Sequence, residues 1–372
     1  MHIQRHPLIS PSLGTQRELL SFHYGPRGRG EKVYLQASLH ADELPGMLVL
    51  HYLKQRLAQA EQAGLLRGEV VVVPVANPIG LSQNLLQLQL GRFEMSCGEN
   101  FNRRYPEFAE WLGDQLEGRL GNDGETNKRI IRSAMQAALA AQRPLTELGS
   151  LRQLLTGLAL DADVVLDLHC DFEAVMHVYC ETPCLDQAEP LYRLLGAEAV
   201  LYAKGSGGAS FDEALSGVWW QLAERFAGRF PIPQACFSAT VELRGQADVD
   251  GAQAQHDAGQ LFAYLQARGV VQGDMPALPP ARCTPTPLAG SETLRAPHAG
   301  VMVFRHQPGD WIEAGQTVLE VIDPLSDTVS AVKASVSGRL YARENRRYAL
   351  QGMDLCRIAG AVAFRTGYLL SA

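Results

Sequence analysis

The 372-residue sequence lacks the features that mark membrane, secreted or nucleic-acid-binding proteins. It has no apolar run of the roughly 18 residues that a bilayer-spanning helix needs, and no apolar secretory segment near its first residues. No basic cluster stands out, and the formal net charge is −7, which disfavours long-range attraction to nucleic acid or anionic lipid. The 7 cysteines are an odd number scattered between Cys97 and Cys356, unlike a disulfide framework. We therefore expect a cytoplasmic protein that binds neither membrane nor nucleic acid.

The composition is that of a folded protein, with 46% hydrophobic and 20% charged residues. An amphipathic helix is predicted over residues 44–63, and a mostly helical stretch over residues 106–160. Short apolar runs predict strands at residues 32–39, 69–75, 163–168 and 238–243. This alternation of strands and helices predicts an α/β sheet with helices on both faces.

The composition changes near residue 274. Residues 274–287 carry five prolines, which favours a stiff linker. Beyond it, short strands, tight turns and a weak internal repeat (Ala296-Pro297-His298-Ala299-Gly300 and Ala334-Ser335-Val336-Ser337-Gly338) predict an all-β region. We therefore divide the chain into an α/β domain at residues 1–273, a linker at 274–287 and a small β domain at 288–372.

Candidate metal ligands stand at the ends of two predicted strands. His40 and Glu43 lie three residues apart where a strand gives way to a helix, so a turn can direct both side chains to one point. Zinc in catalytic sites takes nitrogen and oxygen ligands of this kind, with a third protein ligand and an open water position. Alternation along a strand places Asp167 and His169 on one side, so His169 is a candidate third ligand and Asp167 its neighbour. The alternatives are a surface pair for His40 and Glu43, and a hydrogen-bonded core histidine for His169.

Two further elements carry groups suited to hydrolysis. Glu242 lies within an apolar strand, where a carboxylate is costly unless it has a partner or a task such as proton abstraction from water. Pairing with Arg244 is the alternative. Asn102 and Arg103 combine an amide with a forked guanidinium, which can bind a carboxylate, although such a pair also occurs as a plain loop contact.

In their order, these elements resemble the zinc carboxypeptidase superfamily, and more closely the succinylglutamate desuccinylase/aspartoacylase family. The shared pattern is H-x-x-E with a nearby glycine, N-P-x-G at residues 77–80, Asn102-Arg103, D-x-H at residues 167–169 and a strand glutamate. It covers roughly residues 30–260. The resemblance implies a mixed sheet of the zinc-carboxypeptidase type.

The same resemblance implies a set of roles. His40, Glu43 and His169 would bind one zinc ion, Glu242 would be the general base, and Asn102 with Arg103 would hold a substrate carboxylate. The expected activity is zinc-dependent hydrolysis of an N-acyl amino acid.

Other roles stay open at this point. Arg92 is a candidate cation near the scissile carbonyl, and Tyr202 and Trp220 are candidates for an aromatic that faces the substrate. The glycine-rich residues 203–210 are either a lid or an ordinary loop. Alternative functions are a metallocarboxypeptidase acting on peptides and a non-catalytic binding protein, and a homo-oligomer is compatible with the sequence.

The C-terminal region is similar to biotinyl/lipoyl-type barrel-sandwich domains, through residues 309–316 and the repeat around them. The stretch where such domains carry a modified lysine, residues 322–327, contains none. We therefore expect an unmodified β domain that packs against the catalytic domain or another subunit.

Overall fold

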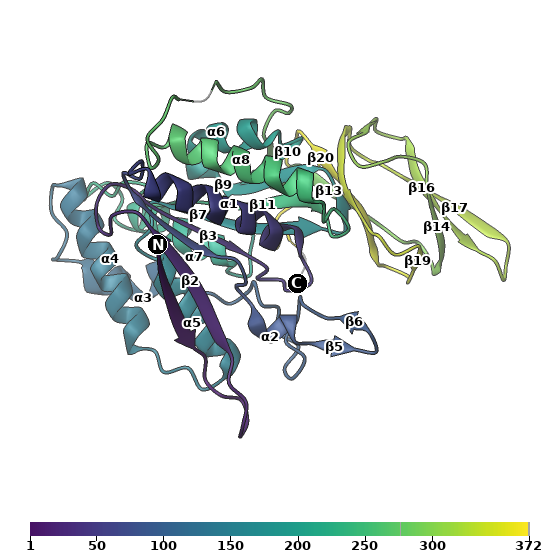
Figure 1. The fold of residues 1–372 in the computed structure, drawn as a ribbon. Helices are drawn as coiled ribbons and strands as arrows, with labels where there is room; N and C mark the ends of the chain where they lie inside the picture. The colour runs from purple at the N-terminus through teal and green to yellow at the C-terminus, as the bar shows by residue number, and fades with distance from the viewer. Residues whose placement is uncertain (276, 371–372) are drawn as a thin grey trace.

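The computed structural model describes residues 1–275 and 277–370. Residue 276 of the predicted linker and residues 371–372 of the predicted β domain lie outside the described residues. The chain forms one large mixed sheet with helices on both faces, and two smaller antiparallel sheets at its C-terminal end (Figure 1). This is the α/β fold with an appended β region that the sequence predicts. No described helix is both long and apolar enough to cross a bilayer.

The large sheet has nine strands in the order β1-β2-β4-β3-β7-β11-β9-β10-β12. Strands β4, β3, β7 and β11 run parallel, and the outer pairs β1/β2 and β2/β4 and the pair β11/β9 are antiparallel. The strand bounds are β1 His2–Pro7, β2 Glu18–Tyr24, β3 Lys32–Ala37, β4 Glu69–Val73, β7 Val164–Asp171, β9 Met176–Glu181, β10 Ala199–Ala203, β11 Phe237–Gly245 and β12 Thr286–Pro287.

Two helical layers cover this sheet (Figure 1). One layer consists of α1 Pro45–Gln62, α6 Leu185–Leu195 and α8 Gly251–Ala267. The other consists of α3 Phe108–Leu116, α4 Gly124–Ala141, α5 Glu147–Ala159 and α7 Phe211–Arg225. Each layer buries its own apolar cluster against the sheet, so the central strands are apolar on both faces. Short elements complete this part of the chain: α2 Pro78–Leu81, β5 Asn84–Leu85, β6 Leu88–Gln89, β8 Glu173–Ala174 and η1 Thr182–Cys184.

The strands and helices predicted from apolar periodicity are confirmed within a few residues. Strands β1, β2, β9, β10 and β12 of the large sheet are not among these predictions. The reason is visible in β1, where only Ile3 and Pro7 break a run of polar and basic residues. Such a strand owes its structure to pairing with β2, which local periodicity does not report.

The C-terminal sheets pack face to face around a core of their own. One joins β13 Ser291–Arg295, β15 Trp311–Ile312, β18 Gly338–Arg343 and β20 Asp354–Gly360 with β8; the other joins β14 Gly300–Phe304, β16 Thr317–Asp323, β17 Thr328–Lys333 and β19 Tyr348–Ala349. A short turn, η2 Leu288–Gly290, precedes them. The glycines that end the two repeats begin β14 and β18. A Cβ on Gly300 would lie 2.4 Å from the Ile322 carbonyl oxygen, and one on Gly338 would lie 2.2 Å from that of Ala359. The repeat therefore marks two positions where the backbone of a neighbouring strand comes too close for any side chain larger than that of glycine.

The C-terminal sheets are attached firmly to the large sheet. Strand β12 extends the large sheet from residues that the sequence analysis placed in the linker. Strand β8 pairs with β18, and Arg343 and Arg347 both bind the Glu173 carboxylate at 2.6 Å. A small apolar cluster that includes Tyr179 and Tyr341 fills the junction. The proposed division into two domains therefore has an interface built from backbone pairing, ion pairs and apolar packing.

Asp163 fastens together the three strands that carry the predicted site residues. Its backbone bonds to Lys32, the first residue of β3, and to Phe237, the first residue of β11, and Asp163 itself directly precedes β7. Its carboxylate accepts from the Lys32 amide at 2.9 Å, from Lys128 Nζ at 2.9 Å and from Arg132 Nη2 at 3.0 Å. Burial opposes ionisation of this group, but those donors outweigh it and lower its pKa.

We predict that Asp163→Asn lowers the free energy of unfolding by about 2 kcal/mol at pH 7, because hydrogen bonds from charged groups are lost. Urea denaturation measures the change. The native pKa of Asp163 is depressed, so its contribution is present above the unfolded pKa of about 4 and is lost as the pH falls through the folded value. The difference between native protein and variant should therefore shrink below about pH 4.

Asp161→Asn is the matched control, because Asp161 is half exposed and pairs only with the Lys32 ammonium among these groups. Its effect should stay within about 0.5 kcal/mol, as for most surface changes. Equal losses for the two variants would contradict the anchoring role of Asp163.

Candidate metal centre and its cavity

The candidate metal ligands lie at the carboxyl ends of β3 and β7. Strand β3 lies between β4 and β7 in the sheet, so the connections that follow β3 lead to strands on opposite sides of it. The carboxyl ends of β3 and β7 therefore flank a crevice. Ligands in open α/β sheets bind at such positions. His40 lies in the turn between β3 and α1, which begins with Pro45. Ser38 has φ of 63°, a left-handed conformation that turns the chain sharply after the strand.

His40, Glu43 and His169 meet as the sequence predicts. All three side chains are buried, and their candidate ligand atoms lie within 4.8 Å of one another. Glu43 bridges the pair: Oε1 lies 2.9 Å from His40 Nδ1, and Oε2 lies 2.7 Å from His169 Nδ1. The Cys170 amide also donates to Glu43 Oε2 at 3.2 Å. This His-Glu-His group could hold a metal ion.

The far side of each imidazole is held by another polar group. His40 Nε2 donates to Asn100 Oδ1 at 2.9 Å, so Nδ1 of a neutral ring presents its lone pair to the site. His169 Nε2 lies 3.0 Å from Asp167 Oδ2, although these two atoms lack hydrogen-bond alignment. Asp167 is held in turn by Gln36 Nε2 at 3.0 Å. Both rings therefore direct Nδ1 at the Glu43 carboxylate.

The charges in the site fit a bound cation. Burial, and then the Arg92 guanidinium, lower the pKa of His40 to about 4, which keeps its ring neutral as a metal ligand must be. Burial would lower the pKa of His169 as well, but the Asp167 and Glu43 carboxylates outweigh it and raise that pKa. These carboxylates therefore favour positive charge at the His169 ring, which a metal cation would supply in place of a proton. Glu43 is buried, yet the two histidines lower its pKa. A carboxylate facing two imidazole nitrogens is a donor set that suits zinc.

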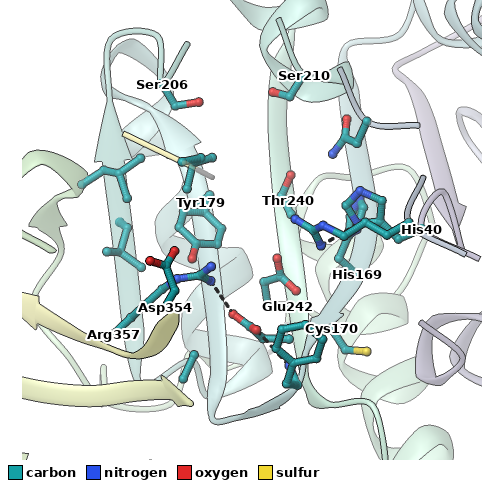
Figure 2. A pocket seen from close by; sticks show the side chains of 18 of the residues that line it. His40, His169, Cys170, Tyr179, Ser206, Ser210, Thr240, Glu242, Asp354 and Arg357 are labelled. Atoms are coloured by element: carbon teal, nitrogen blue, oxygen red, sulfur yellow. Dashed lines mark hydrogen bonds and ion pairs between the residues drawn. The ribbon is translucent and has the colours of Figure 1, made fainter. Parts of the chain in front are cut away.

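Glu242 stands beside this group on β11. It is in register with His169 on the parallel neighbour β7, so the two side chains share one face of the sheet. Its Oε2 is buried without a hydrogen-bond partner, and Figure 2 shows the side chain between Tyr179 and His169. Burial, and then the Glu43 charge, raise the pKa of Glu242 to about 8. Positive charge at the metal position would oppose this rise.

Arg244 is not the partner of Glu242. Its guanidinium binds Asp257 on α8, and its own φ of 65° marks an irregular end of β11. The local bend turns Arg244 away from the row that carries Glu242, so the alternative ion pair considered from the sequence is absent among the described contacts.

Arg92, Asn102 and Arg103 all line the cavity that contains His40 and Glu242. Arg92 is nearest to the ligands, with Nη1 3.3 Å from His40 Nδ1 and 3.6 Å from Glu43 Oε1. The Asn102 side chain holds the start of α7, because its Oδ1 accepts a hydrogen bond from the Phe211 amide at 2.8 Å. Arg103 donates to the Asn102 carbonyl at 2.7 Å and lies over Gly208, where a Cβ would come within 2.8 Å of its Cδ.

The cavity has a volume of about 500 Å³ and is closed on one side by the C-terminal sheets. Arg346, Asp354 and Arg357 from that region line it. Arg357, labelled in Figure 2, forms an ion pair of 2.7 Å with Asp171. Sequence analysis found none of these residues, because nothing in the local pattern of β20 indicates which surface its side chains face.

The aromatic candidates named from the sequence lie elsewhere. Neither Tyr202 nor Trp220 lines the cavity, whereas Phe93, Phe172 and Tyr179 do. Trp220 instead donates from Nε1 to Glu181 Oε1 at 2.9 Å. Tyr179 lies two residues from Glu181 on β9, and no motif around it signals its position.

The glycine-rich residues 203–210 form one wall of the cavity. Backbone bonds join Gly208 and Ala209 to Arg104 and Tyr105, and the Ser206 carbonyl accepts from the Leu369 amide. The segment is therefore tied on both flanks, and opening would break these bonds. Its action as a lid stays a prediction.

Comparison with known proteins supports one family. The catalytic-domain profile of the succinylglutamate desuccinylase/aspartoacylase family matches residues 29–267. A comparison with curated proteins finds no match.

Several solved structures share the fold. A succinylglutamate desuccinylase/aspartoacylase family protein from Shewanella amazonensis is 24% identical with a TM-score of 0.83, over 96% of this chain and 98% of that one. A second, from Shewanella frigidimarina, is 24% identical with a TM-score of 0.82, over 96% and 97%. The product-bound ectoine utilization protein EutE from Ruegeria pomeroyi is 14% identical with a TM-score of 0.66, over 96% and 95%.

These structures share the fold along nearly the whole chain, including the C-terminal sheets. The family profile covers β3 to α8 and so includes every candidate ligand and Glu242. The chain belongs to the succinylglutamate desuccinylase/aspartoacylase family.

Proposed function

We propose that the protein is a zinc-dependent hydrolase that removes the acyl group from an N-acyl amino acid. The observation that carries the proposal is the unpartnered Glu242 carboxylate oxygen beside the His40, Glu43 and His169 group in one cavity. Bound by these three ligands, zinc would polarise the amide carbonyl and lower the pKa of a water molecule. Family membership agrees with deacylation.

The residues of the chain supply the remaining steps. Glu242 takes a proton from the attacking water and passes it to the leaving amine. Arg92, beside His40 and Glu43, is placed to stabilise negative charge that develops on the carbonyl oxygen. Arg103 binds the substrate carboxylate through its planar fork, and Asn102 fixes the adjacent backbone through Phe211.

The size of the cavity favours a small substrate over a peptide. A volume of about 500 Å³ lies in the range of small-molecule sites. Arg346 and Asp354 of the C-terminal region, together with Leu370, line the cavity and reduce the space open to a longer chain. The deacylase proposal therefore has more support than the carboxypeptidase alternative.

We predict that His169→Ala loses most of its bound zinc, because two protein ligands remain where three are needed. Elemental analysis of dialysed protein measures the metal content. His51→Ala is the control, since His51 is exposed on α1 and bonds only to Gln55 among the described contacts. Full zinc content in the His169 variant would contradict the ligand assignment.

Glu242→Gln should keep its zinc and reduce kcat by about 10²- to 10⁴-fold, the range for loss of a general base. Gln preserves the shape of the side chain but not its basic carboxylate. Steady-state kinetics on a hydrolysed N-acyl amino acid, with metal analysis of the same sample, measures both quantities. Normal turnover at full zinc content would remove Glu242 from the reaction.

Arg103→Lys should raise KM by about 10-fold or more, since a charge is kept but the bidentate geometry is lost. Native protein should also turn over the α-carboxamide of the same substrate far more slowly than the acid. If the acid and the amide react at equal rates, Arg103 does not recognise a carboxylate.

A further inference from the structure

One wall of the cavity is formed by carboxylates that the proposed reaction does not use. Glu181 ends β9, and Asp212 and Glu213 lie in the first turn of α7. All three line the same cavity as Glu242 and Arg103. Asp212 and Glu181 are buried, with 7% and 3% of their surfaces exposed. This acidic wall (Glu181, Asp212 and Glu213) therefore faces the substrate space rather than bulk solvent.

Helix capping does not account for these carboxylates. Ser210 and Glu213 stand at the N-cap and third positions of α7, the spacing of a capping box. Yet Ser210 makes no side-chain cap bond, and its hydroxyl donates to Asp212 Oδ1 at 2.6 Å. Glu213 Oε1 accepts from the Ser206 amide at 2.5 Å, away from the helix. Glu181 stands at the N-cap of the short helix η1 but makes no side-chain cap bond there. Its two oxygens accept instead from Ser216 Oγ at 2.5 Å and from Trp220 Nε1 at 2.9 Å.

The hydroxyl of Ser206 supplies an independent sign of a ligand. Ser206 is only 3% exposed, and its Oγ is buried without a hydrogen-bond partner. It lines the cavity beside the acidic wall, and Figure 2 shows its hydroxyl directed to the side on which Ser210 lies. A buried hydroxyl left unpaired costs free energy unless something in the cavity bonds to it.

The acidic wall is also short of positive charge. Arg343, Arg346 and Arg357 line the cavity but pair with Glu173, Glu344 and Asp171 respectively. Arg92 serves Glu43. Arg103 interacts with Asp212 and Glu213, and one guanidinium balances only one of the three carboxylates. Burial raises the pKa of all three, that of Glu181 to about 8, as is typical of carboxylates without sufficient counter-charge.

We propose that the acidic wall and the Ser206 hydroxyl bind an ammonium group of the substrate, so that the N-acyl amino acid has a side chain ending in a primary amine. This inference rests on the proposed deacylase function. An ammonium has three N–H donors and no acceptor, which matches acceptors on Asp212, Glu213 and Ser206. Arg103 then takes the carboxylate of the same molecule.

The test compares three substrates with zinc-loaded native protein: Nα-acetylornithine, N-acetylnorvaline and N-acetylglutamate. Norvaline matches ornithine without the terminal amine, and glutamate reverses the charge. We expect kcat/KM for the ornithine derivative to exceed that for norvaline by about 10- to 100-fold, the effect of one or two charge-assisted hydrogen bonds. A preference for norvaline or glutamate would overturn the ammonium site while deacylation stands.

Variants of the acidic wall test which residues cause the preference for the ornithine derivative over the norvaline derivative. Glu213→Gln and Asp212→Asn should each lower the ornithine-to-norvaline ratio of kcat/KM by about 10-fold. Because the ratio is taken within one sample, partial misfolding cancels. Glu224→Gln on the same helix is the control, since Glu224 is exposed, outside the cavity and paired with Lys204. Ratios unchanged in both cavity variants would place the preference elsewhere and overturn the assignment.

Binding of the free amino acids separates this inference from catalysis. Calorimetry with native protein should show ornithine binding about 10-fold more tightly than norvaline, and Glu213→Gln should remove the difference. If neither the acetylated substrates nor their succinylated counterparts are hydrolysed, the deacylase proposal fails. The calorimetric comparison still decides the ammonium site, which is overturned if ornithine and norvaline bind alike.

Discussion

The parallel pairing of β3, β7 and β11 sets the positions of the candidate metal ligands and of Glu242. The backbone hydrogen bonds of these strands fix Glu242 opposite His169 and bring the end of β3, with His40 beyond it, alongside β7. Asp163 ties the other end of the same strands through backbone and ionic bonds. Because side chains alternate along a strand, a shift of one residue would turn Glu242 away from His169. The register is therefore the constraint on which the site depends.

The strand register surrounds the buried Glu43 carboxylate with groups that stabilise its charge. A carboxylate removed from water is unfavourable unless charges and donors surround it, and here two imidazoles, an arginine and a backbone amide do so. Asn100 and Asp167 then fix the orientation of each ring from behind. The result is a group of nitrogen and oxygen atoms that face one another and are suited to a shared cation.

The C-terminal sheets add a wall to this crevice and turn it into a cavity closed on one side. Pairing of β8 with β18 and the ion pairs of Glu173 and Asp171 hold them against the large sheet. Arg346, Asp354 and Arg357 thereby reach the same cavity as His40, although more than 300 residues separate the two ends in sequence. A wall made this way restricts the size of what can enter and sets the charge around it.

The sequence by itself predicted strands β3, β4, β7 and β11, helix α1, the helical stretch of α3 to α5, the meeting of His40, Glu43 and His169, and the family. Continuous apolar runs such as residues 69–73 report burial on both faces, and H-x-x-E followed by D-x-H reports chemistry in short local patterns. Tertiary structure alone decided the edge strands β1 and β2, the pairing of Arg244 with Asp257, and the cavity positions of Tyr179, Glu181 and Arg357. These depend on contacts between residues distant in sequence, and no local periodicity encodes such contacts.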